Sequence, residues 1–129
     1  MDRPTIVCLC GSTRFSEAFQ QANLKETLAG KIVLTIGCDT KSDGELFGSE
    51  EEKASIKAML DELHLRKIDL ADEVLFLNVG GYIGESTRRE YDYALGHGKI
   101  IRFLEPTSLP SQFETIDESY GWYLHNTTH

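Results

Sequence analysis

The sequence predicts an α/β fold built on a three-layer, doubly wound parallel sheet of four to five strands. The first observation is that short apolar, β-rich runs alternate along the chain with stretches whose apolar residues recur at helical spacing. The second is the run at residues 74–79, which shows no polar alternation and is therefore typical of a strand covered by helices on both faces. A chain of 129 residues fits a single domain spanning residues 1–129.

The first part of the chain predicts two strands joined by one helix. Residues 5–9 form the first β-rich run and residues 31–36 the second. Between them, four apolar residues recur at helical spacing: Phe15, Phe19, Ala22 and Leu28. Gly30 is placed to end this helix. Residues 37–48 are polar, acidic and glycine-bearing, so they predict a surface loop.

The second part predicts a long helix, the central strand, a shorter helix and a final strand. Ser49 and Glu52 match a capping box, so the long helix should begin there. Its apolar stripe comprises Ile56, Met59, Leu60, Leu63 and Ile68. His97 and Gly98 close the helix after the central strand, and residues 100–104 form a further strand. With right-handed crossovers, this succession predicts the strand order 2-1-3-4 of flavodoxin- and Rossmann-like sheets.

The composition indicates a globular chain and argues against two kinds of partner, a membrane and a nucleic-acid polymer. No apolar run approaches the roughly 20 residues of a membrane span. The first apolar stretch, residues 6–10, is far too short for a signal-peptide core, so we expect a cytoplasmic protein. The formal charge of −8 argues against a nucleic-acid polymer as partner, because Lys and Arg supply most of that affinity. A single nucleotide in a local pocket remains compatible with this charge.

The three cysteines indicate neither a disulfide framework nor a metal cluster. Cys8 and Cys10 belong to the first predicted strand, and we expect them on opposite faces of the sheet as buried, inert thiols. No two histidines have the spacing of metal ligands on one face. We therefore expect no catalytic metal and no cofactor.

The loop after the first strand is the first candidate binding element. It comprises Cys10, Gly11, Ser12, Thr13 and Arg14. Backbone N–H groups, hydroxyls and a guanidinium suit a phosphate or a sugar hydroxyl. The alternative is an ordinary helix cap with a solvated arginine. The loop is neither a Walker A sequence nor a Gly-x-Gly-x-x-Gly sequence.

The glycine loop after the central strand is the second candidate, and Glu90 follows it. Gly80, Gly81 and Gly84 permit close backbone approach to a ligand. We expect Ser86 or Thr87 to cap the following helix. In a sheet ordered 2-1-3-4, the loops after strands one and three face the same crevice. Glu90 is then the candidate catalytic carboxylate, whereas the alternative is a tight turn followed by a surface glutamate.

His64 is the second candidate catalytic residue. It lies near Leu60 and Leu63 on the side of the apolar stripe of the long helix. We therefore expect it to be partly buried and able to point at the crevice. A structural histidine with satisfied hydrogen bonds is the alternative.

These residues resemble a known superfamily. The sequence Leu-Cys-Gly-Ser-Thr-Arg at residues 9–14 resembles the first loop of the 2'-deoxynucleoside 5'-phosphate N-hydrolases. Residues 89–95, with Gly98 and Lys99, resemble the Glu-x-Gly-x-Ala helix of the nucleoside 2-deoxyribosyltransferases. The resemblance covers about residues 5–104 in the order of elements, and its specific motifs are the two loops and the helix that carries Glu90.

The resemblance implies an N-glycosidase or deoxyribosyltransferase acting on a nucleoside or nucleoside 5'-monophosphate. Glu90 would attack the anomeric carbon, displace the base and form a covalent ester that water or a second base resolves. The residues expected to bind substrate are Cys10, Gly11, Ser12, Thr13, Arg14, Gly81, Gly84, Glu85, Ser86 and Thr87. The resemblance also implies a homo-oligomer, a dimer or larger, and Tyr120, Trp122 and Tyr123 suit either an interface or the core of the protomer.

Two positions depart from the superfamily pattern. His64 stands where relatives carry an aspartate on the long helix, and a histidine there can still donate a hydrogen bond to Glu90 or to a departing base. Asp92 stands where relatives have the glycine of Glu-x-Gly.

The glycine loop also resembles, less closely, that of cytokinin-activating phosphoribohydrolases. The remaining alternatives are a nucleotide-binding or sensing module without turnover and a flavodoxin-like interaction domain with no small-molecule role.

Overall fold

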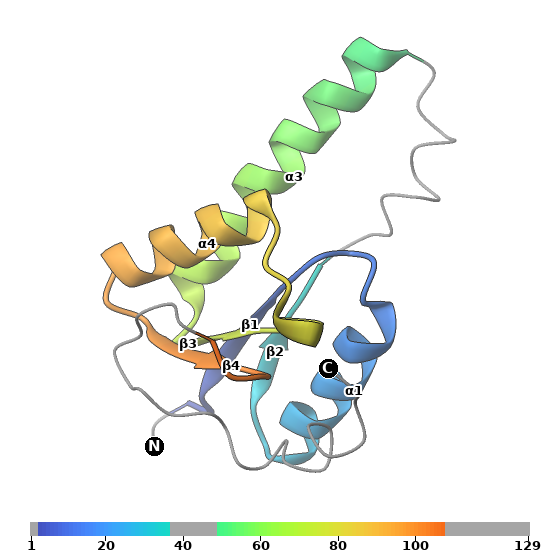
Figure 1. Ribbon diagram of the computed structural model, residues 1–129. Helices are drawn as coiled ribbons and strands as arrows, with labels where there is room; N and C mark the ends of the chain where they lie inside the picture. Colours follow the sequence, from blue (N-terminus) through green and yellow to red (C-terminus); the bar gives the residue numbers. More distant parts are fainter. Residues whose placement is uncertain (1–2, 37–48, 108–129) are drawn as a thin grey trace.

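The computed structural model describes residues 3–36 and 49–107. Four strands form one parallel sheet in the order β2-β1-β3-β4 (Figure 1). Their bounds are Ile6–Cys10 for β1, Ile32–Leu34 for β2, Glu73–Phe76 for β3 and Ile100–Phe103 for β4. The predicted α/β class and strand order are therefore confirmed.

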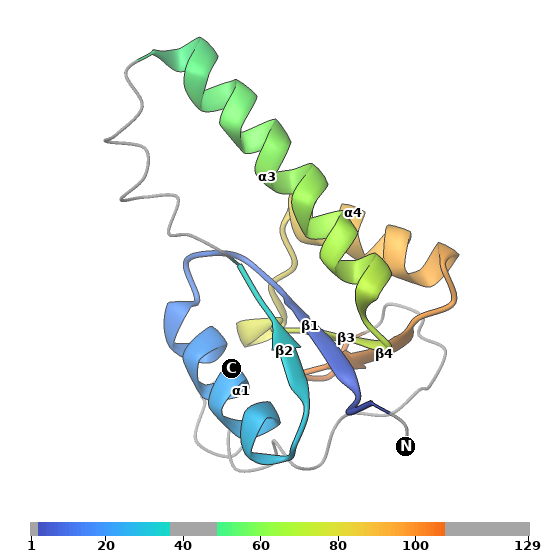
Figure 2. The ribbon, with the colours of Figure 1, turned by 180° about the vertical axis from the view of Figure 1, so that it is seen from behind.

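Helices cover both faces of this sheet and make it a three-layer structure. Helix α1, Ser16–Leu28, packs on one face, and helices α3, Glu50–Leu70, and α4, Glu85–Gly96, pack on the other (Figures 1 and 2). A short 3-10 turn, η1, spans Val79–Gly81 between β3 and α4. The N-terminal part of α3 extends well away from the sheet.

The strands divide their side chains between two hydrophobic clusters. On β1, Val7 and Leu9 pack toward α1, whereas Cys8 and Cys10 pack toward α3 and α4. The expectation that the two cysteines lie on opposite faces is wrong, because residues two apart on a strand point to the same face. Both thiols are fully buried, as expected. The shared face brings them to the side where His64 lies.

Several local expectations are confirmed at the helix ends. Ser49 is the N-cap of α3 and its hydroxyl accepts a hydrogen bond from the Glu52 N–H at 3.1 Å. Gly30 follows the end of α1 with a φ of 85°. His97 is the C-cap of α4, and Gly98 follows it with a φ of 69°.

Three apolar residues of the predicted helical stripes do not reach the core. Leu28 is 78% exposed because it points away from the face of α1 on which Phe19, Ala22 and Glu26 are buried. Met59 is 53% exposed and Leu63 is 46% exposed on α3. Periodicity predicted their helical spacing but not which face of each helix packs on the sheet.

Some sequence expectations concern segments outside the described residues. These are the loop at 37–48 and the aromatic residues Tyr120, Trp122 and Tyr123. Among the described residues, no helix combines the length and the apolar character needed to cross a membrane.

Candidate active site

The loops after β1 and β3 leave the same edge of the sheet in direct contact. Cys10 is in register with Phe76, and the Leu77 N–H donates to the Cys10 carbonyl at 2.8 Å. A Cβ added to Gly11 would meet both the Cβ and the carbonyl oxygen of Leu77 at 3.3 Å. The first loop therefore needs a glycine where it passes the end of β3, and this close passage joins the two loops at one edge, as expected.

Arg14 and Tyr82 connect the two loops through their side chains. The Arg14 guanidinium carbon lies 4.4 Å from the centroid of the Tyr82 ring, and Nη2 donates to the Tyr82 hydroxyl at 3.3 Å. Phe15 meets the same ring edge-on at 5.9 Å between centroids. Arg14 remains exposed, so the guanidinium is held on an aromatic face while it keeps donors for a ligand.

Helix α4 begins differently from the sequence expectation. Its N-cap is Gly84, which places Ser86 and Thr87 inside the first turn. The expectation that one of them caps the helix is therefore wrong, because a capping side chain must stand before the first helical residue. The Ser86 hydroxyl instead accepts a hydrogen bond from Arg89 at 3.2 Å, and Thr87 is buried.

The remaining loop candidates differ in their surroundings. Gly81 has a φ of 80°, and a Cβ added to Gly84 would meet the Tyr82 hydroxyl at 3.1 Å. Glu85 and Thr13 are exposed, and the Glu85 carboxylate lies 3.9 Å from Arg89. Gly84 therefore allows Tyr82 to fold back over the loop, whereas Glu85 and Thr13 point to solvent.

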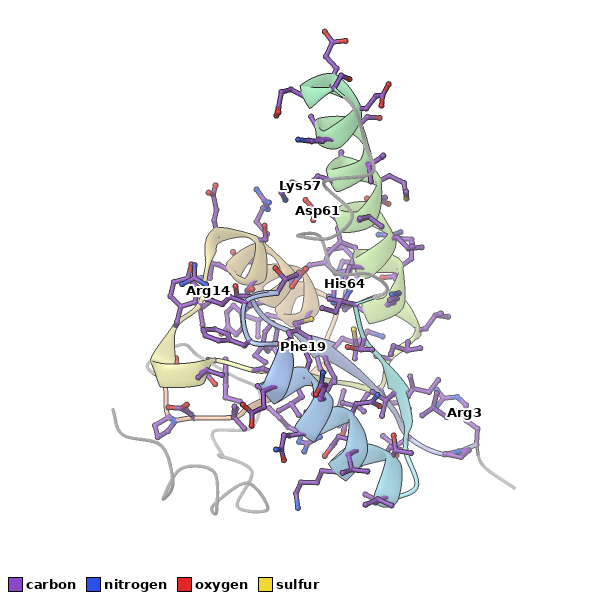
Figure 3. The ribbon with its side chains drawn as sticks, turned by 90° about the vertical axis from the view of Figure 1, so that its right-hand side faces the viewer. Arg3, Arg14, Phe19, Lys57, Asp61 and His64 are labelled. Carbon is purple, nitrogen blue, oxygen red and sulfur yellow. The ribbon has the colours of Figure 1, made fainter. Side chains whose placement is uncertain are left out.

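His64 lies in a buried cluster with the two cysteines of β1. Its Nε2 is 3.3 Å from the Cys10 sulfur and 3.7 Å from the Cys8 sulfur. The side chain is only 7% exposed. Figure 3 shows His64 on the half of α3 that leads to the sheet, with Asp61 and then Lys57 toward the N-terminal end of the helix. Both thiols therefore lie next to the imidazole, and the sequence analysis did not predict this contact.

Glu90 joins this cluster from α4. Its side chain is half-buried, and it lies close enough to Cys10 and His64 for the groups to shift one another's ionisation. Burial raises the pKa of Glu90 to about 7, and the positive charge of His64 opposes that rise. Cys10 directly precedes Gly11, so the carboxyl group stands beside the start of the first loop.

The pKa values of Cys8, Cys10 and His64 also depend on one another. Burial and hydrogen bonding to Cys8 raise the pKa of Cys10, whereas the hydrogen bond from Cys10 lowers the pKa of Cys8 to about 6. Burial by itself would lower the pKa of His64, but its hydrogen bond to Cys8 and the charges of Cys8 and Glu90 raise it. The result favours a protonated imidazole beside a thiolate and a carboxyl group.

Sequence reasoning missed three residues of this region. Cys8 is detectable from the two-residue period of a strand, which places it on the same face as Cys10. Asp61, one turn before His64 on α3, contributes a negative charge that further raises the pKa of Glu90. One sequence feature could have indicated Tyr82, because it is an aromatic residue inside a glycine loop.

Comparisons with known proteins give matches to solved structures only. No family model and no curated protein sequence matches the chain. A solved structure of 2-deoxyribosyltransferase from the psychrotolerant bacterium Bacillus psychrosaccharolyticus matches with a TM-score of 0.56 and 15% sequence identity. The match covers 82% of this chain and 76% of that chain. The chain is thus a distant structural relative of a 2-deoxyribosyltransferase, with which it shares an α/β fold.

Proposed function

We propose that the protein cleaves or transfers the N-glycosidic bond of a nucleoside, deoxynucleoside or nucleoside 5'-monophosphate, with Glu90 as the nucleophile. The observation that carries this proposal is the half-buried Glu90 carboxyl group beside Cys10 and His64, at the sheet edge from which the Gly11 loop departs. In open α/β sheets, ligands bind outside this edge, where strand order reverses. The shared fold with a 2-deoxyribosyltransferase supports the same reaction class.

The proposed chemistry proceeds in two steps. The Glu90 carboxylate attacks the anomeric carbon, and the base leaves with the electrons of the broken C–N bond. A protonated His64 supplies the proton that the departing base needs. Water or a second base then attacks the glycosyl ester and frees Glu90, which gives hydrolysis or transfer respectively.

The proposed substrate contacts come from the residues that follow Gly11 in the first loop. The Arg14 guanidinium and the backbone N–H groups of the loop would bind the 5'-phosphate or a sugar hydroxyl. Tyr82 holds Arg14 in place through ring stacking and a hydrogen bond. Arg14 therefore belongs to substrate binding and Glu90 to bond cleavage.

The experiment that tests this function is release of free base from a panel of nucleosides and 5'-monophosphates, in ribo and deoxy forms, followed by chromatography. Glu90→Gln should lower kcat by at least about a thousandfold, because the amide cannot form the ester. Asp92→Asn is the matched control, since Asp92 is exposed on the same helix and pairs with Arg88, and it should retain the parent activity.

Two further results complete this test. Adding a second free base distinguishes transfer, which yields a new nucleoside, from hydrolysis. The proposal fails if no substrate releases base, or if Glu90→Gln matches the parent. Thermal stabilisation by a nucleotide without any base release would instead support a binding module.

A further inference from the structure

Three groups with strong affinity for soft metal ions lie together on the face of the sheet that α3 and α4 cover. Cys8 and Cys10 come from β1, and His64 comes from α3. Their sulfur and ring nitrogen atoms all lie within 4.8 Å of one another. All three residues are buried, so the arrangement is fixed by packing between the strand and the helix.

The spacing of these atoms fits one face of a coordination tetrahedron. Zinc–sulfur bonds of about 2.3 Å and zinc–nitrogen bonds of about 2.0–2.1 Å place the S and N atoms about 3.5 Å apart in tetrahedral geometry. The observed distances from His64 Nε2 to the two sulfurs are 3.3 and 3.7 Å, which lie on either side of that value. Small side-chain adjustments would therefore suffice to place one ion between the three atoms.

We propose that Cys8, Cys10 and His64 bind a single zinc ion, with the Glu90 carboxylate able to occupy the fourth position. Thiolate and imidazole ligands in a tetrahedral set select zinc over magnesium and calcium, which require oxygen ligands. On binding, each cysteine that carries a proton releases it to solvent, and His64 coordinates as the neutral imidazole. Glu90 is half-buried, so the fourth position is the one nearest to solvent.

Zinc binding would be a property separate from the proposed glycosidic reaction. It would use His64 and Glu90 in ways that are incompatible with that reaction. A zinc-bound imidazole cannot deliver a proton to a departing base, and a zinc-bound Glu90 cannot attack an anomeric carbon. Zinc should therefore inhibit base release. Metal binding is measurable without any substrate, so failure of the zinc site and failure of the proposed reaction give different results.

The first experiment uses the full-length parent protein, stripped with a chelator and kept reduced. Titration with Zn²⁺ against a chromophoric chelator should give one tight site per chain. Co²⁺ should give the visible bands of a tetrahedral site together with a thiolate-to-cobalt charge-transfer band. This spectrum identifies sulfur ligands without any substitution. Absence of both the stoichiometric site and the charge-transfer band would overturn the proposal and leave a hydrogen-bonded cluster only.

Variants then identify the ligands. Cys8→Ser, Cys10→Ser and His64→Gln should each weaken zinc binding by at least about 100-fold, since each removes one ligand. His97→Gln is the matched control, since His97 is exposed at the C-cap of α4, and it should bind like the parent. Circular dichroism establishes that each variant is folded. Unchanged affinity in any folded ligand variant removes that residue from the site, and unchanged affinity in all three overturns the proposal.

Discussion

The surroundings of Glu90 keep part of its carboxyl population protonated, and therefore uncharged, at physiological pH. Burial disfavours the charged carboxylate and raises its pKa from 4.5 to about 7. The neighbouring Asp61 charge acts in the same direction, whereas His64 opposes it. A carboxylate must be ionised to act as the proposed nucleophile, so burial also sets the pH at which the proposed reaction would begin.

The first prediction is a rate profile that follows this ionisation. In metal-free protein, kcat/KM for base release should rise about tenfold per pH unit below the pKa of Glu90, about 7, and should fall again at higher pH, where His64 loses the proton that it donates to the base. Initial rates measured from about pH 5 to about pH 9 check this. An acidic limb centred near the ordinary pKa of a glutamate would contradict it.

The second prediction concerns stability. The folded pKa is raised, so the contribution of Glu90 is fully present below about pH 4.5 and is lost as the pH rises through about 7. Glu90→Gln removes the buried charge and should gain about 1–2 kcal/mol over the parent at about pH 8, a value reduced by solvent screening at a half-buried side chain. At about pH 4 the two should unfold alike. Urea denaturation at both pH values measures the difference, and an equal gain at both would refute this cause.

The third prediction concerns Arg14, which Tyr82 holds at the loop edge. Arg14→Gln should raise KM for 5'-monophosphates about tenfold or more, because a charge-assisted hydrogen bond to phosphate is lost. Nucleosides without the phosphate should be affected little. Arg88→Gln is the matched control, since Arg88 is exposed and pairs with Asp92 within α4. Equal losses on both substrate classes would show that Arg14 does not bind the phosphate.

At the scale of elements, the ends of the helices decide how the chain enters and leaves the sheet. Gly30 turns the chain from α1 into β2 with a φ of 85°. Gly96 is the last residue of α4. No atom lies within 4 Å of a Cβ placed on either glycine, so the two positions differ in backbone conformation and not in available space.

The fourth prediction uses this contrast. Gly30→Ala should lower the free energy of unfolding by about 1–2 kcal/mol, because an L-residue is strained at positive φ. Gly96→Ala should raise it by about 0.5–1 kcal/mol, because alanine loses less entropy in a helix. Thermal and urea unfolding of both variants provide the comparison. Changes of the same sign would contradict the conformational explanation.

At the scale of the whole molecule, a buried ion network ties α1 to β3, to β4 and to Lys31, the residue before β2. Arg102 of β4 contacts the Glu26 carboxylate at 2.6 Å and the Glu73 carboxylate at 2.8 Å. Lys31 contacts the same two carboxylates at 3.1 and 2.8 Å. Glu26 is almost fully buried on α1. The network therefore compensates two carboxylates with two cations where the helix packs against the sheet.

The fifth prediction removes one cation. Arg102→Met should cost about 2–4 kcal/mol of unfolding free energy, because it removes a cation that contacts two carboxylates in a poorly solvated place. Adding Glu26→Gln should recover part of this loss. Lys57→Met is the control, since its pair with Asp61 is exposed and worth at most about 1 kcal/mol. Chemical denaturation should separate the variants, and an equal cost for both would refute the role of burial.

Much of this architecture follows from the sequence. The apolar runs predicted every described strand, and the alternation with helices predicted the order β2-β1-β3-β4. Both signals are local periodicities that packing on two faces imposes on a chain. Boundaries were less accurate: β2 was predicted over residues 31–36 and spans Ile32–Leu34, because pairing with β1 limits its length.

The candidate site was predicted only in part. The sequence suggested the loop at residues 11–14 from its place after the first strand, Glu90 from the glycine loop before it, and His64 from its place beside the apolar stripe of the long helix. It did not predict the partner of Arg14, since Tyr82 approaches from a loop 68 residues away. It also misplaced Cys8 relative to Cys10 and took Ser86 or Thr87 as a cap, which Gly84 provides instead.

The sequence by itself determined the elements, their order in the sheet and the edge at which the glycine loops emerge, because these depend on local periodicity and on the handedness of crossovers. Only the tertiary structure decided that His64 lies between two thiols and beside Glu90. Such contacts depend on the rotation of α3 and α4 about their axes and on how far each helix extends over the sheet. Packing of the whole core sets these quantities, and no local pattern in the chain encodes them.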